Sequence, residues 1–80
     1  GGDLPGFLLG AIRSAKGIEQ LAQSLRGQQI THLMLREDLL SGFLSNNLAP
    51  DQARLWSDFA TSRLQLKFRD RGHAVYELNG

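Results

Sequence analysis

The sequence predicts an α+β domain in which a small sheet of about three strands is packed by three helices. Near the end of the chain, two apolar runs alternate with period two around Asp70-Arg71-Gly72, which is typical of a β-hairpin. Upstream, apolar residues recur with helical spacing over residues 18–25, 39–44 and 53–60. A further apolar run, at residues 30–35, has the character of a strand. The expected order is therefore helix, strand, two helices and hairpin.

Residues 1–13 are glycine-rich and apolar, and Pro5 can begin a short helix. We expect them to form an apolar N-terminal arm that rests on the domain or on a missing neighbour, ahead of a single domain over residues 14–80. The chain begins Gly-Gly-Asp rather than with methionine. We therefore expect it to be a fragment of a longer protein.

The first full helix is expected to begin after Ser14, which can cap it, and to run to about Arg26. Its apolar residues share one face: Ile18, Leu21, Ala22 and Leu25. Gly27 is expected to end it in the left-handed conformation.

Residues 30–36 are expected to form the central strand of the sheet. Apolar residues fall on both of its faces: Ile30 and Met34 on one, Leu33 and Leu35 on the other. A strand that is covered on both faces has this pattern.

Two more helices should follow. Glu37 and Asp38 stand where carboxylates stabilise the start of a helix, and Asn46-Asn47 can end it. Pro50 opens the last helix at its first position, and Thr61-Ser62 closes it. The side chains expected to face the core are Leu39, Leu40, Phe43 and Leu44 on one helix, and Ala53, Trp56, Phe59 and Ala60 on the other.

For the hairpin we expect a three-residue loop, with Gly72 at its left-handed position. This loop pairs residue 69 with 73, 68 with 74, 66 with 76 and 64 with 78. All six apolar side chains then lie on one face: Leu64, Leu66, Phe68, Ala74, Tyr76 and Leu78.

Composition excludes several classes of function. Eighty residues make one small domain, and a net charge of +1 gives no basic footprint for nucleic acid. The absence of cysteine excludes disulfides and thiolate metal sites. His32 and His73 lie too far apart in the sequence to form a metal-binding spacing, and no cofactor motif is present, so we expect neither metal nor cofactor.

A possible ligand site or interface lies where the expected central strand enters a helix, at Arg36, Glu37 and Asp38. Ligands of open α/β sheets bind at such ends. Neighbouring residues at this junction point in different directions, and the plainer interpretation is a helix-start charge pattern beside a surface arginine. An independent small enzyme would depend on these three residues alone, so enzymatic activity stays an open question.

A second set of residues could contact an anionic surface such as lipid headgroups: Arg63, Lys67, Arg69 and Arg71. They lie on, or close to, the face of the hairpin expected to point outward. The plainer interpretation is that basic side chains stud an edge strand and prevent edge-to-edge pairing.

The run QITHLMLREDLL at residues 29–40 and the ending LKFRDRGHAVYEL at residues 66–78 resemble a known family. They are similar to the C-terminal tail of bacterial polytopic membrane glycosyltransferases, the dolichyl-phosphate-mannose mannosyltransferase-like proteins that use lipid-linked sugars. Tails of that family contain a "GITHLLV-R-DL" strand and a closing "GY-LYEL" strand. The resemblance covers residues 18–78; Gln29 replaces the expected glycine, and His73-Ala74 replaces a more aromatic pair.

The family's catalytic acidic residues lie in extracytoplasmic loops near the start of the membrane region, outside this chain, so the resemblance implies no catalytic residue here. It implies a noncatalytic accessory domain on the extracytoplasmic side of a bacterial inner membrane, partnered by the membrane domain of the same parent chain. The alternative is a freestanding, cytoplasmic protein-interaction module whose apolar arm, residues 4–12, docks a partner.

Overall fold

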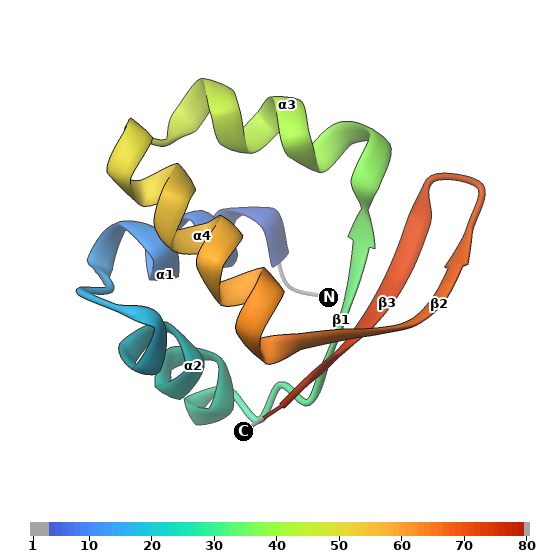
Figure 1. Ribbon diagram of the computed structural model, residues 1–80, viewed down its shortest axis with the longest axis horizontal. Coiled ribbons are helices and arrows are strands. Elements are labelled where there is room, and N and C mark those ends of the chain that lie inside the picture. Colours follow the sequence, from blue (N-terminus) through green and yellow to red (C-terminus); the bar gives the residue numbers. More distant parts are fainter. Residues whose placement is uncertain (1–3, 80) are drawn as a thin grey trace.

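The computed structural model describes residues 4–79, in which four helices pack on one face of a three-stranded antiparallel sheet (Figure 1). The elements are α1 (Leu4–Ser14), α2 (Ile18–Gly27), β1 (His32–Arg36), α3 (Glu37–Asn47), α4 (Pro50–Arg63), β2 (Leu64–Asp70) and β3 (His73–Leu78). The predicted α+β class and the order from α2 onward are confirmed, and α1 is an additional helix. Residues 1–3 of the expected arm lie outside the described part of the chain.

The segment expected to be an arm is for the most part the helix α1, which belongs to the core. Leu8 and Ile12, one turn apart, are fully buried, and Ala11 between them is nearly so. These side chains join the same cluster as Leu21 and Leu25 of α2. Burial of this apolar face offsets the low helix propensity of the two glycines within α1.

The start and the end of α2 both differ from expectation. Ser14 ends α1 and does not cap α2, because the chain crosses between the helices in an extended conformation at Gly17. The backbone N–H of Lys16 donates instead to Gln20 Oε1, at 2.6 Å. After the helix, the left-handed residue is Gln29 (φ 60°) rather than Gly27.

The strand order is β1-β3-β2, so β3 is central and β1 lies at an edge. The prediction that residues 30–36 form the central strand is therefore wrong. Leu33 and Leu35 point into the core, but Met34 points away from the helices and is 66% exposed. The apolar pattern gave the wrong strand position because only one of the two apolar faces of this strand is buried; the other face is exposed.

The hairpin turn has two residues, Arg71 (φ 50°) and Gly72 (φ 82°), rather than three. Positive φ at both positions is the type I′ geometry. Asp70 pairs with His73, and a bulge between Leu66 and Phe68 inserts one extra residue farther along β2. The pairs Leu66–Tyr76 and Leu64–Leu78 agree with the expected register.

The bulge reverses two side chains relative to the prediction. Phe68 pairs with Val75, not with Ala74, and so lies on the face away from Tyr76 and the helices, where it is 61% exposed. Arg69 pairs with Ala74 and takes the inner position that was expected for Phe68. The six apolar residues of the hairpin therefore do not share one face.

The core lies between the inner face of the sheet and the four helices, with Leu44 as the buried residue of α3. Its largest fully buried side chains are Phe59, Leu8, Ile12, Leu21, Leu25 and Leu33. The ring of Trp56 lies 5.9 Å from that of Phe59, centroid to centroid, and is only partly buried. Part of the indole ring is therefore exposed at the surface of the domain.

Candidate functional site

The start of α3 is held against the turn of the hairpin. The backbone N–H of Glu37, the first residue of α3, donates to the carbonyl oxygen of Gly72 at 2.7 Å. A helix start leaves its first N–H groups without partners in the helix, and this bond satisfies one of them. The contact holds the start of α3 beside the turn that joins β2 and β3.

The Glu37 carboxylate is bound by two side chains of the hairpin. Arg69 donates from Nε to Glu37 Oε1 at 2.7 Å and from Nη2 to Oε2 at 3.0 Å. Tyr76 Oη donates to Oε2 at 2.6 Å. We call this group the Glu37–Arg69–Tyr76 cluster. It forms because the bulge in β2 turns Arg69 to the helix side of the sheet.

Each member of the cluster stabilises the charge state of the others. The Arg69 guanidinium and, after it, the Tyr76 hydroxyl hold the pKa of Glu37 below its ordinary value. The pKa of Arg69 is raised by the carboxylate. The hydrogen bond to Glu37, followed by burial, raises the pKa of Tyr76. At neutral pH the cluster thus contains a carboxylate, a guanidinium and a neutral phenol, and its net charge is zero.

The other two predicted site residues bind each other. Arg36 donates from Nε and Nη2 to the two carboxylate oxygens of Asp38, at 3.1 and 3.0 Å. This pair lowers the pKa of Asp38 and raises that of Arg36. Glu37 and Asp38 therefore point to different partners, as expected for neighbours at a strand–helix junction, and do not form a paired acid and base.

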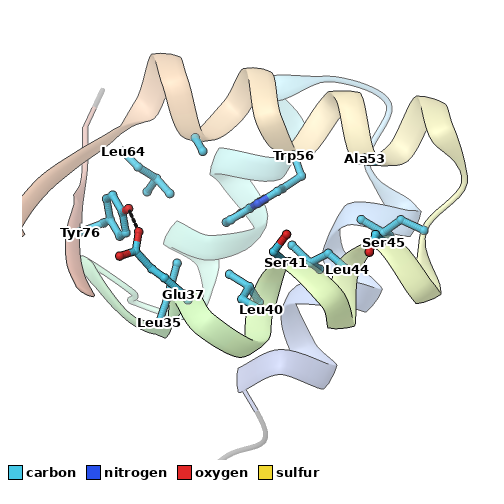
Figure 2. Close-up of a pocket in the computed structure, with 12 residues that line it drawn as sticks. Leu35, Glu37, Leu40, Ser41, Leu44, Ser45, Ala53, Trp56, Leu64 and Tyr76 are labelled. Carbon is cyan, nitrogen blue, oxygen red and sulfur yellow. Dashed lines mark hydrogen bonds between the residues drawn. The ribbon is translucent and has the colours of Figure 1, made fainter. Parts of the chain in front are cut away.

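A pocket of about 380 Å³ opens beside the cluster, between α3 and α4. Figure 2 shows Glu37 and Tyr76 at one end and the Trp56 ring projecting from α4 toward α3. We call it the α3–α4 pocket. Its lining residues are Leu35, Glu37, Leu40, Ser41, Leu44, Ser45, Leu48, Ala53, Trp56, Ala60, Leu64 and Tyr76. It is therefore a mostly apolar cleft, with Glu37 and Tyr76 at one end and Ser41 and Ser45 along α3.

No family model fits the sequence, and neither the curated proteins nor the solved structures include a significant match. Among residues 4–79, no group of three or more histidine, aspartate and glutamate side chains is placed to hold a metal ion. Within the same residues, no helix has the length and apolar character needed to span a membrane.

The four basic residues predicted to contact an anionic surface are separated by the fold. Arg63 pairs with Glu19 at 2.6 Å and Arg69 with Glu37, both on the helix side. Lys67 lies on β2, with its Nζ 3.9 Å from Glu77, and Arg71 is exposed at the turn. Arg63 and Arg69 are therefore engaged on the helix side, whereas Lys67 lies on β2 beside Glu77 and Arg71 lies at the turn.

The outer face of the sheet bears an apolar row that crosses all three strands. Met34 of β1 and Phe68 of β2 both pair with Val75 of the central strand. We call these three residues the open-face row. Met34 also lines a second, almost wholly apolar groove of about 480 Å³ between α1, β1 and α3, together with the exposed Leu39. The row and the groove therefore share Met34.

Sequence reasoning identified Glu37 but missed Arg69 and Tyr76 as its partners, because they lie 32 and 39 residues away. Trp56 was expected to pack in the core. It does pack against the core, and it also forms one wall of the α3–α4 pocket. The bulge that places Arg69 has no signal in the sequence beyond the polar residues around it.

Proposed function

We propose that this chain is a noncatalytic accessory domain that docks, through the open face of its sheet, onto the membrane domain of a glycosyltransferase-like parent protein. The observation that carries the proposal is the open-face row, with Met34 and Phe68 about two-thirds exposed (66% and 61%). On a sheet with one solvated face, the outward residues are ordinarily polar.

Exposed apolar side chains in a contiguous group mark surfaces that bind other molecules. Each Å² of apolar area removed from water contributes about 25 cal/mol, so Met34, Val75 and Phe68 favour a partner that covers them together. The polar side chains nearby do not interrupt the row: His32 and Lys67 both lie close to Glu77, which is two residues along β3 from Val75.

The choice of partner is supported by the resemblance described above. Its two motifs, at residues 29–40 and 66–78, include β1, most of β2 and all of β3, the strands that carry the open-face row. The resemblance further supports a location on the extracytoplasmic side of a bacterial inner membrane. Lys67 on β2 and Arg71 at the exposed turn are the residues that would meet anionic lipid headgroups.

Reading the coding sequence upstream of Gly1 tests the origin of the chain. The proposal predicts several apolar segments of about 20 residues, each long enough to span a bilayer. A complete reading frame without such segments would exclude a membrane parent.

Site-specific photocross-linking tests the docking face itself. A photoreactive residue is placed at position 68 of the full-length protein, and a matched one at position 57, which is exposed on α4. We expect position 68 to cross-link to the membrane domain of the same chain, and position 57 to give no such product. Cross-links from position 68 to a separate protein, with none to the parent, would replace this proposal by the freestanding interaction module.

A further inference from the structure

The α3–α4 pocket lies on the helix side of the sheet, away from the open-face row, so docking leaves it unused. We propose that this pocket binds a small neutral amphiphile, a molecule with an apolar body and an uncharged head that donates a hydrogen bond, such as a hydroxyl or amide. The proposal is independent of the partner proposed above.

The pocket exists because small residues face each other across α3 and α4. Ser41 and Ser45 line it from α3, and Ala53 and Ala60 line it from α4, one turn to either side of Trp56. Larger side chains at these positions would fill the gap. Leu40, Leu44 and Leu64 supply most of the remaining wall, so the body of the ligand should be apolar.

The size of the pocket sets the size of the ligand. Its volume of about 380 Å³ is within the range of small-molecule sites. Because a water molecule occupies roughly 30 Å³ of liquid, this space holds on the order of a dozen non-hydrogen atoms.

The polar end determines the head group. Glu37 Oε2 receives hydrogen bonds from Arg69 and Tyr76, whereas Oε1 receives one, from Arg69 Nε. A carboxylate oxygen accepts two hydrogen bonds, so Oε1 has one position left for a donor. The Ser41 hydroxyl, one helical turn farther along the same face of α3, offers a second polar contact.

The same end disfavours charged heads. A cationic head that approached Glu37 would also meet the Arg69 guanidinium, and an anionic head that approached Arg69 would meet the Glu37 carboxylate. Because the two charges are already paired, an ion would lose its hydration without gaining an unopposed partner.

Trp56 provides the assay, because it is the single tryptophan of the chain and forms a wall of the pocket. The 80-residue chain is titrated with 1-octanol below its solubility limit, and with octanoate and octylammonium below their micellar concentrations, while tryptophan emission is recorded. We expect a saturable change with 1-octanol and binding of the two ions that is weaker by about tenfold or more. No saturable response, or equal binding of an ion, would overturn the proposal.

Three variants locate the ligand and its head. Ser41→Leu fills the pocket and should weaken 1-octanol binding by at least about tenfold, whereas Ser57→Leu, the same change at an exposed position outside the pocket, should leave it unchanged. Glu37→Gln leaves the charge of Arg69 unbalanced, so octanoate should become the preferred ligand.

Undiminished binding to Ser41→Leu, or an unaltered preference in Glu37→Gln, would contradict the assignment. Should a variant fail to fold, methyl NMR of the wild-type chain decides the matter. Shifts induced by 1-octanol must then centre on Leu40, Leu44 and Leu64, and shifts centred on the open-face row would overturn the proposal.

Discussion

Gly72 closes the hairpin in a backbone conformation that side-chain-bearing residues rarely adopt, with φ at 82°. A Cβ atom at this position would lie 3.0 Å from Asp38 Cγ. The turn and the start of α3 therefore approach each other as closely as glycine permits. Asp38 is held there by Arg36, so its side chain cannot simply move away without losing that pair.

Replacement of Gly72 by alanine should lower the free energy of unfolding by about 1–2 kcal/mol from the left-handed backbone alone, with the contact to Asp38 adding to this. Gly42→Ala is the matched control. Gly42 lies on the exposed side of α3 with open space around it, and alanine there should stabilise the helix by up to about 1 kcal/mol. Urea unfolding measures both, and an equal effect of the two substitutions would contradict the turn geometry.

The Glu37–Arg69–Tyr76 cluster should make stability depend on pH. The pKa of Glu37 is lowered in the folded chain, so its contribution is complete above the ordinary glutamate value of about 4.3 and is lost as pH falls through the lower, folded value. Glu37→Gln should therefore be less stable than wild type at neutral pH, and the difference should narrow in acid.

Urea unfolding of both proteins from pH 7 to pH 3 tests this, with Asp58→Asn as the control. Asp58 is exposed on α4 and has no ion pair within residues 4–79, so its variant should stay within about 0.5 kcal/mol of wild type. A constant difference between Glu37→Gln and wild type across this range would show that the carboxylate contributes no charge-dependent stability.

At the residue scale, the length of the hairpin turn could not be predicted from the sequence. A two-residue type I′ turn and a three-residue loop both place Gly72 at positive φ, so glycine alone does not separate them. The choice determines whether Phe68 or Arg69 faces the helices. It is made by the tertiary contacts of Arg69 with Glu37, which lie far away in the sequence.

At the scale of elements, periodicity succeeded where the apolar residues fall on a single face of the element and failed where they fall on both faces. In α2 the apolar residues Leu21, Ala22 and Leu25 share one buried face, as predicted, and α4 begins at Pro50, as predicted. The strand β1 has apolar residues on both sides. This pattern is typical of a central strand, and equally of an edge strand whose outer face is apolar and exposed. The helix α1 was not predicted as a full helix, because its two glycines have low helix propensity.

A pair of leucine substitutions tests the place of α1. Leu8→Ala removes a fully buried side chain and should cost about 2–5 kcal/mol, because the core cannot close around the cavity without loss. Leu39→Ala, at a side chain that is 58% exposed, should cost much less. Chemical denaturation compares the two. Equal, small effects would mean that α1 is a detachable arm after all.

For the whole molecule, the two surfaces for which we propose binding roles lie on opposite sides of one sheet. The open-face row faces outward, and the α3–α4 pocket lies among the helices. Neither could be predicted from the sequence, because the row depends on the strand order and the pocket depends on which residues of α3 and α4 face each other. The sheet can thus be covered by a partner on one side while the pocket stays accessible on the other.

Hydrogen exchange can test the strand order on which this arrangement depends. Thr31 accepts from Leu78, and Glu37 donates to Gly72, so the odd-numbered residues of β1 bond to β3. The amide of Met34 then points to the open edge. We expect it to exchange much faster than those of Leu33 and Leu35, whereas β3, bonded on both sides, should be the best protected strand. Equal protection at Met34 and Leu35 would mean that another strand covers this edge in solution, and the sheet would then have to be rebuilt around β1.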